Sequence, residues 1–196
     1  MMAKLTRDSL QSLESYAKNR PEFRAAVMLH KKNRQLDLND HITLLFEDEL
    51  TIRYQVQEML RSERIFEEAG IQDELNAYNP LIPDGSNWKA TMLISYPDIE
   101  ERKKKLAELV GIEHKIWVQV EGNEKVYAIA DEDLERSTEN KTSAVHFLRF
   151  ELSPGMIQAL KSGAALATGI DHPVLTVRVD RVPEATRKAL IGDLSA

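Results

Sequence analysis

The chain has 196 residues, a formal charge of −6 at neutral pH and no cysteine. This length is typical of one domain with a sizeable core, and an apolar content of 42% argues against disorder. The missing cysteines exclude disulfides, thiol catalysis and cysteine-ligated iron–sulfur clusters. The acidic balance gives no general attraction to phosphate backbones, so we expect no nucleic-acid partner.

The sequence also indicates the compartment. No stretch approaches the ~18 apolar residues of a membrane-spanning helix, and Met1 to Leu10 lacks the apolar core of a secretory signal. We therefore expect a cytoplasmic protein without a membrane partner.

The first half of the chain predicts helices around one extended segment. Thr6 can cap a helix that runs to about Asn19, and Pro21 starts a second helix that ends in the basic residues 31–34. Residues 36–46 alternate in polarity, which is typical of a strand or hairpin. Residues 48–68 return to helical spacing and have two apolar faces, and the proline-rich segment 78–87 is predicted to be an ordered loop.

The second half alternates between predicted strands and helices. Strands are expected at 90–96, 116–121, 124–130, 143–152, 164–170 and 174–182. Helices are expected from Pro97 to Gly111, from Ser153 to Gly163 and over 183–190. Gly122-Asn123 is a hairpin signal, so the strands around it should pair antiparallel.

These elements predict an α+β fold in a single domain, with a largely antiparallel sheet packed by helices and an N-terminal helical pair. Its regions are the N-terminal helices (1–34), a strand or hairpin with the central helix (35–70), the main sheet (89–182) and the C-terminal helix (183–196).

Known catalytic and metal-binding patterns are missing. The five histidines are at least 11 positions apart, so no H-x-H or H-E-x-x-H pair occurs, and no glutamate precedes a histidine by three residues. Asp131, Asp133 and Glu135 imitate the start of a calcium loop that lacks its glycine and final glutamate, which predicts a solvated loop. We predict no metal site and no cofactor, and assign no catalytic residue.

The predicted central helix carries a displaced charge. Glu63 falls within the apolar stripe that includes Ile52, where an unpaired carboxylate would cost several kcal/mol. Glu58 and Arg61 are one turn apart on the more polar side. The pattern allows a buried ion-pair network that orients the helix, or a recognition site whose arginines hold a carboxylate, a phosphate or the acidic face of a partner.

Three segments supply the candidate binding residues. The predicted loop 78–87 contributes polar groups. The predicted strand 143–152 contributes His146, which alternates with apolar residues and should be buried. Arg149 and Glu151 share a face of that strand and could join the helix network. The candidates are Arg53, Tyr54, Gln57, Glu58, Arg61, Glu63, Arg64, Asn79, Asp84, His146, Arg149 and Glu151.

Two long segments resemble a known family. FEDELTIRYQVQEMLRSERIFEEAGIQDELNAYNPLIPDGSNWKAT and VYAIADEDLERSTENKTSAVHFLRFEL are similar to the uncharacterised bacterial family called domain of unknown function three-five-zero-one, and the likeness extends from Leu5 to about Pro173. The family supplies no activity. The resemblance implies genes located beside those of rubrerythrin-like di-iron proteins and iron–sulfur oxidoreductase subunits.

Our leading hypothesis is a non-catalytic cytoplasmic binding or accessory protein of a peroxide-stress or iron–sulfur electron-transfer system, with one of those proteins as partner. The alternative is a small-molecule- or metal-binding enzyme with a pocket between the central helix and the sheet. There Glu58 or Glu63 would act as base or ligand, and Arg61, Arg149 or His146 would bind an anion or metal. An uncovered sheet edge also allows a homodimer.

Overall fold

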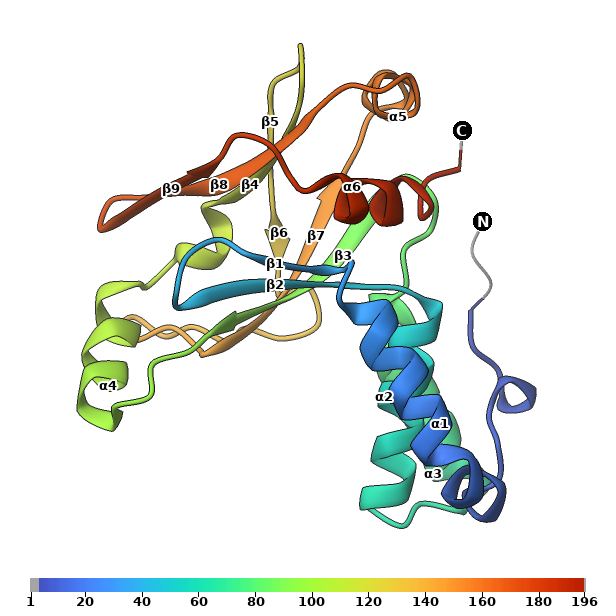
Figure 1. Ribbon diagram of the computed structural model, residues 1–196. Coiled ribbons are helices and arrows are strands. Elements are labelled where there is room, and N and C mark those ends of the chain that lie inside the picture. The colour runs from blue at the N-terminus through green and yellow to red at the C-terminus, as the bar shows by residue number, and fades with distance from the viewer. Residues whose placement is uncertain (1–3, 196) are drawn as a thin grey trace.

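The computed structural model, which describes residues 4–195, consists of two stacked antiparallel sheets with a lobe of helices at one end (Figure 1). The strand order is β1-β2-β3-β7-β6 in the five-stranded sheet and β5-β4-β8-β9 in the four-stranded sheet. The predicted single-domain α+β fold is confirmed. Residues 1–3 of the predicted N-terminal region and Ala196 of the C-terminal one lie outside the described residues.

The strands are β1 (Gln35–Asp37), β2 (Ile42–Glu47), β3 (Asn87–Ile94), β4 (Ile116–Val120), β5 (Lys125–Tyr127), β6 (Ile129–Ala130), β7 (Val145–Glu151), β8 (Leu166–His172) and β9 (Leu175–Val179). The helices are α1 (Leu13–Lys31), α2 (Glu49–Ser62), α3 (Glu68–Tyr78), α4 (Ile99–Glu108), α5 (Pro154–Lys161) and α6 (Glu184–Ile191), with short 3-10 turns η1 (Arg7–Ser9), η2 (Asn79–Leu81) and η3 (Ile112–His114). Across residues 4–195, no helix is both long and apolar enough for a bilayer crossing.

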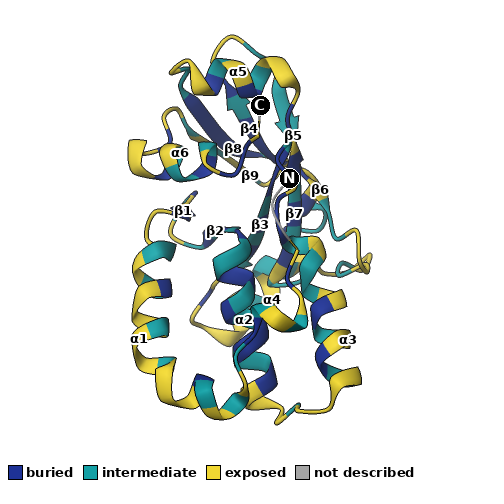
Figure 2. Ribbon diagram, turned by 90° about the vertical axis from the view of Figure 1, so that its right-hand side faces the viewer, coloured by how far each residue is buried: buried dark blue, intermediate teal, exposed yellow. Residues whose placement is uncertain are grey.

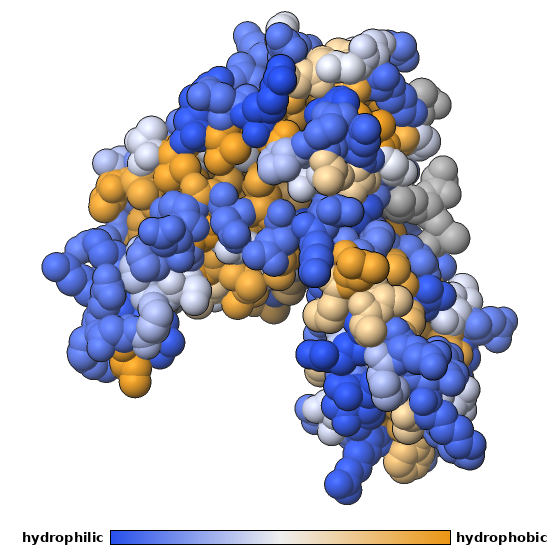
Figure 3. Space-filling model, in the orientation of Figure 1, coloured by the Kyte–Doolittle hydropathy of each residue, from blue (hydrophilic) through white to orange (hydrophobic). Residues whose placement is uncertain are grey.

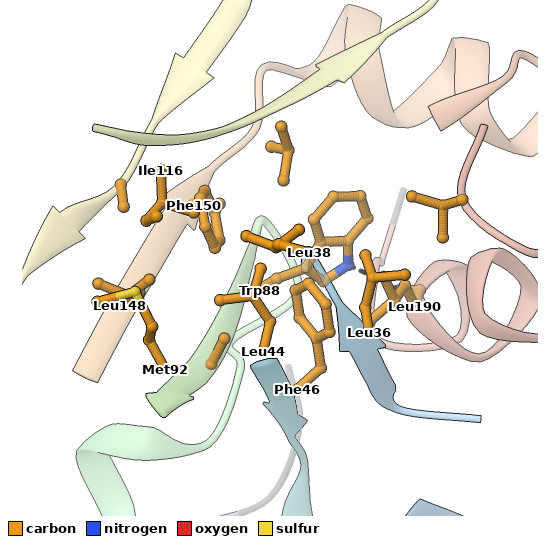
Figure 4. Packing of buried hydrophobic residues seen from close by; sticks show 14 of the residues in the cluster. Leu36, Leu38, Leu44, Phe46, Trp88, Met92, Ile116, Leu148, Phe150 and Leu190 are labelled. Atoms are coloured by element: carbon orange, nitrogen blue, oxygen red, sulfur yellow. Dashed lines mark hydrogen bonds between the residues drawn. The ribbon is translucent and has the colours of Figure 1, made fainter. Parts of the chain in front are cut away.

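The main core lies between the two sheets because each strand presents alternate side chains to it. β2 alternates buried and half-buried residues, and its buried Phe46 lies opposite Ala90 of β3. Trp88 is fully buried and donates its indole N–H to the Leu190 carbonyl at 2.8 Å, which attaches the end of α6 to the core (Figure 4).

The outer face of the five-stranded sheet, which points away from the four-stranded sheet, is only partly covered. Leu45, Leu93 and Phe147 on this face are half-buried, and Val145 is 38% exposed. The surface is hollowed beneath the sheet, between α4 and the helical lobe (Figure 3). This face is therefore available for contacts beyond the core.

The helical lobe has an apolar core of its own. The face of α2 that includes Val56 packs with α3 and the N-terminal segment, while Tyr54, on the other side of α2, packs against Phe23 of α1 with ring centroids 6.1 Å apart. The prediction that two faces of the central helix are buried is confirmed. The core residues are Leu5, Leu10, Ile52, Val56, Leu60, Ile71, Leu75 and Ile82.

The two helices predicted before residue 34 are one helix, and the segment after Thr6 forms only the turn η1. Pro21 lies inside α1, where it cannot donate to the Ala17 carbonyl. Both residues are exposed, so water can satisfy that carbonyl, and the fully buried Tyr16 and Val27 keep the helix packed on both sides of the proline. The first turns of α1 bend away from the rest of its axis (Figure 1).

The central helix ends at Ser62, earlier than predicted. Arg64 adopts a left-handed conformation with φ of 56°, and the N–H of Ile65 bonds to the Leu60 carbonyl at 2.9 Å, which is a Schellman end. Glu63 and Phe66 therefore leave the apolar stripe, and Phe66 is 71% exposed. The predicted burial of Glu63 is wrong because the chain reverses before this residue reaches the core.

Arg34, at the junction of α1 and β1, joins three parts of the fold. Its guanidinium is 5% exposed and contacts Asp48, the N-cap of α2, at 2.8 Å. It also forms a bidentate pair with Asp193 after α6, at 2.6 and 2.9 Å. His30 Nε2 lies 2.6 Å from the same Asp48 carboxylate. The helical lobe, the sheet and the C-terminal segment thus meet at one buried charge network.

We expect Arg34→Met to lower the free energy of unfolding by about 3–5 kcal/mol, because it leaves the Asp48 and Asp193 carboxylates buried without their cation. Urea unfolding followed by circular dichroism measures this loss. Arg24→Met, on the exposed side of α1, is the matched control and should change stability by less than about 0.5 kcal/mol. Equal effects of the two variants would contradict the role of Arg34.

Candidate functional site

The polar strip of α2 is occupied by contacts with α1. Glu58 accepts hydrogen bonds from the Tyr16 hydroxyl at 2.7 Å and from the Arg20 guanidinium at 2.7 and 2.8 Å, and Arg61 lies 3.5 Å away. The Arg20 hydrogen bonds, opposed by partial burial, lower the pKa of Glu58 to about 2. Burial and the Glu58 carboxylate raise the pKa of Tyr16 above its usual value. This geometry supports the interpretation of the strip as an ion-pair network that holds two helices together.

The other candidates on α2 do not converge on a shared pocket. Gln57 is buried, and its amide bonds to the main chain of Gln11 through Oε1 at 2.6 Å and Nε2 at 3.4 Å. Arg53 lies 3.6 Å from Glu49 and faces the Phe23 ring. Glu63 and Arg64 are exposed at the end of the helix.

The loop candidates have local roles. The Asn79 side chain bonds both the N–H and the carbonyl of Leu5, at 2.8 and 2.9 Å, and so attaches the N-terminal segment to the helical lobe. Asp84 is exposed and accepts a hydrogen bond from the N–H of Ser86 at 3.2 Å. Burial disfavours the ionised form of Asp84, but the hydrogen bonds from Ser86 outweigh this effect and lower the pKa of Asp84. Neither side chain faces the α2 strip in a common site.

Arg149 and Glu151 belong to a different network from Glu58, so the prediction that they share one is wrong. Arg149 forms a bidentate pair with Glu132 at 2.7 and 2.8 Å and also donates to Glu151 at 2.6 Å. The pKa of Glu132 is lowered by these Arg149 hydrogen bonds. The reason is topological, because β7 lies on the far side of β3 from β2, the strand that leads into α2.

This second network borders a cavity of about 520 Å³ between α3 with η2 and the outer face of the five-stranded sheet. The loop after β6 forms its rim, and Figure 2 shows that loop and α3 on the same side of the sheet. Its walls combine apolar and charged side chains. The lining residues are Glu74, Asn76, Ala77, Tyr78, Pro80, Leu81, Lys89, Glu132, Asp133, Phe147, Leu148 and Arg149.

Lys89 is the unusual group in this cavity. It is half-buried on β3, in register between Glu47 of β2 and Arg149 of β7. Glu47 is already bound by Thr51 and Thr91, at 2.6 and 2.7 Å. Within residues 4–195, no acceptor or carboxylate lies within bonding distance of the Lys89 amine. Burial, with help from the nearby Arg149 charge, lowers the pKa of Lys89.

His146, predicted to be buried, is fully buried and lies in a cluster at the other end of β7. Its Nδ1 is 2.6 Å from Asp131 Oδ2, and its Nε2 is 2.8 Å from Thr142 Oγ1 and 3.1 Å from the Ser143 carbonyl. Glu113 Oε2 lies 3.9 Å from the same Nε2. Both ring nitrogens are thus engaged by polar groups inside the fold.

Glu113, Asp131 and His146 could also supply metal ligands, since one atom from each lies within 4.8 Å of the others. Such a donor set suits a divalent transition metal. An ion between His146 Nε2 and Glu113 would displace the Thr142 contact, while Asp131 would orient the ring from Nδ1. Since hydrogen bonds already satisfy these atoms, we assign the cluster to internal pairing. Burial opposes ionisation of Glu113, but a Ser137 hydrogen bond and the His146 charge lower its pKa.

Sequence reasoning missed Lys89, Glu132, Glu113 and the pairing of Asp131. The sequence predicts a solvated loop at Asp131, whereas the carboxylate of this residue is held by His146 and by the N–H of Phe147 at 3.0 Å. Lys89 had a detectable signal, because it is a charged residue between Trp88 and Ala90 in a strand of alternating burial. The four residues reach these sites through strand pairing, which their spacing along the chain does not reveal.

Comparison with known proteins identifies the family. A family model described as "Protein of unknown function (DUF3501)" matches residues 4–194. The chain belongs to this family. A DUF3501 assignment agrees with the resemblance of its two long segments.

One solved structure extends this likeness to three dimensions. A crystal structure of a protein of unknown function from Burkholderia pseudomallei K96243 is 54% identical to the chain and has a TM-score of 0.94. The match covers 98% of this chain and 100% of that one. None of the curated proteins compared with the chain matches it.

The pairing of Glu58 predicts a pH dependence. Its pKa in the folded protein, about 2, is below the ordinary 4.5, so the pairing stabilises the fold above pH 4.5 and is lost as the pH falls toward 2. At pH 6 the wild type should have a larger free energy of unfolding than Glu58→Gln. This difference should be smaller by roughly 2–3 kcal/mol at pH 2, as measured by urea unfolding. Glu14 forms an exposed ion pair with Lys18, so Glu14→Gln should show the same pH dependence of stability as the wild type. A pH-independent difference would refute the pairing.

The His146 cluster predicts a large local effect. His146→Gln should lower the free energy of unfolding by about 3 kcal/mol, because the buried Asp131 carboxylate and Thr142 hydroxyl lose their hydrogen-bond partner. His114→Gln, where the side chain is 62% exposed, should cost less than about 0.5 kcal/mol. Thermal and urea unfolding of both variants provide the measurement, and similar small losses would show that the cluster does not stabilise the fold.

Proposed function

We propose that this protein is a binding protein whose ligand is a small neutral organic molecule held in the cavity beneath the five-stranded sheet. The observation that carries the proposal is the half-buried Lys89, which lines a cavity with apolar and charged walls and lacks a partner within residues 4–195. A volume of about 520 Å³ lies in the range of cavities that hold small molecules. Tyr78, Leu81 and Phe147 offer the apolar surface for such a ligand.

The charges around the cavity favour a neutral ligand over an anion. Three carboxylates, those of Glu74, Glu132 and Asp133, line it together with the cations of Lys89 and Arg149. Arg149 is already bound by two carboxylates, Glu132 and Glu151. An added anion would therefore meet more negative than free positive charge. The ligand class that fits is an apolar molecule with one polar group directed at Lys89.

This proposal keeps the binding class that the sequence suggested and moves the site from the α2 strip to the space beside α3. Glu58 is committed to Tyr16 and Arg20, so α2 offers no free recognition charge at that position. A cytoplasmic location and an accessory role beside a rubrerythrin-like or iron–sulfur oxidoreductase partner stay predictions. They are supported by the sequence and by the family resemblance alone.

A cavity-filling variant tests the site. We expect a ligand-observed NMR screen of neutral aromatic and aliphatic fragments to find binders of the wild type, and Leu81→Trp to abolish binding because the indole occupies the cavity. Leu29→Trp, at a position that is 66% exposed, is the matched control and should retain every binder. Circular dichroism establishes that both variants fold. Fragments that bind Leu81→Trp as well as wild type would rule out this cavity as the site.

A further inference from the structure

The position of Lys89 suggests what its amine does. Trp88 and Ala90 point into the core, so Lys89 projects from the outer face of β3 into the cavity. It lies directly opposite Arg149 in the register of β3 and β7. The amine is therefore half removed from water, adjacent to a fixed guanidinium, and open to a bound molecule.

Burial and the Arg149 charge disfavour the protonated amine, the carboxylates of Glu132, Asp84 and Glu151 favour it, and the net effect lowers the pKa of Lys89. Burial removes water that would solvate an ammonium group, and the Arg149 charge repels it. A lysine that is desolvated and placed near another cation is the arrangement that makes an amine nucleophilic toward carbonyl compounds. An exposed lysine, such as Lys188 on α6 with 72% of its side chain accessible, has neither feature.

Resting on the proposed function, we propose that Lys89 captures an aldehyde or ketone group of the cavity ligand as an imine. The amine nitrogen forms a bond to the carbonyl carbon, the carbon–oxygen π bond breaks, and a proton moves from nitrogen to oxygen to give a carbinolamine. The hydroxyl then takes a second proton and leaves as water, so that the protonated imine remains. No oxidant or reductant takes part, and water reverses the reaction.

The cavity also contains a carboxyl group that can supply the second proton. Glu74 lines the cavity, and burial together with the nearby Glu63 and Asp73 raises its pKa, so its carboxyl group is suited to donate the proton that the departing hydroxyl needs. Glu132 is held as a carboxylate by Arg149 and does not supply this proton. An aldehyde or ketone matches the cavity better than an anion does, because it brings no charge into a space already bordered by carboxylates.

Reductive trapping tests this inference. The full-length protein is incubated with benzaldehyde and sodium cyanoborohydride, which reduces the protonated imine to a stable amine, and peptide mass mapping gives the labelling rate at each lysine. At pH 7 we expect Lys89 to be labelled several-fold faster than Lys188, because its amine lines the cavity that binds the aldehyde and less of it is protonated. Labelling of Lys89 should also persist to lower pH. Lys89→Met should lose this fast site, whereas Lys188→Met should keep it.

Benzyl alcohol and benzoate separate the possible outcomes. If the alcohol binds in the cavity and Lys89 is labelled no faster than Lys188, the imine inference is overturned and the binding function stands. If only benzoate binds, and binding depends on Lys89, the amine acts as an ammonium that pairs with anions, which overturns both the inference and the neutral ligand class. If benzaldehyde, benzyl alcohol and benzoate all fail to bind, and Lys89 reacts no faster than Lys188, the proposed cavity function and the inference are both overturned.

Discussion

The Arg34 guanidinium fixes the relation between the helical lobe and the sheets. It is held by Asp48, which caps α2, and by Asp193, which follows α6, while its own carbonyl accepts the N–H of Phe46 in β2 at 2.8 Å. Two apolar cores form the two parts of the molecule, one between the sheets and one among the helices. Apolar contacts alone would let these cores shift against each other, whereas a bidentate buried pair has one geometry. This pairing anchors the start of α2, and α3, which borders the cavity, packs against α2 through the helical core.

Most charged side chains at buried or half-buried positions are satisfied inside the fold, and this makes Lys89 informative. Glu58 is bound by Arg20 and Tyr16, and Arg149 by two carboxylates. Because removing a charge from water without a partner is costly, a half-buried lysine without one is a position where the fold keeps a group for another purpose. The same reasoning assigns the polar strip of α2 to helix packing and leaves the sheet face beside α3 as the recognition surface.

The sequence predicted what local spacing controls. The hairpin at Gly122-Asn123, the burial of His146 and the two packed faces of α2 follow from periodicity and turn chemistry. The predictions that were wrong concern segments where local conformational preferences compete with tertiary packing. Pro21 stays in a helix because packing on both sides outweighs one lost hydrogen bond, and Glu63 is exposed because a left-handed residue ends α2 first. The cavity draws on α3, η2, β3, β7 and a loop, and no spacing rule brings five such segments together.

Asp131 connects the buried cluster to the cavity. It adopts a left-handed backbone with φ of 52°, which is unfavourable by about 1 kcal/mol for most residues and least so for Asp and Asn. Its carboxylate offsets this cost through contacts with His146, the Phe147 N–H and Arg136. The next two residues, Glu132 and Asp133, form the rim of the cavity, and Arg136 binds Asp133 while covering the Phe147 ring. The buried histidine thus helps to position the carboxylates at the rim of the cavity, so a residue remote from the ligand space influences the charge around it.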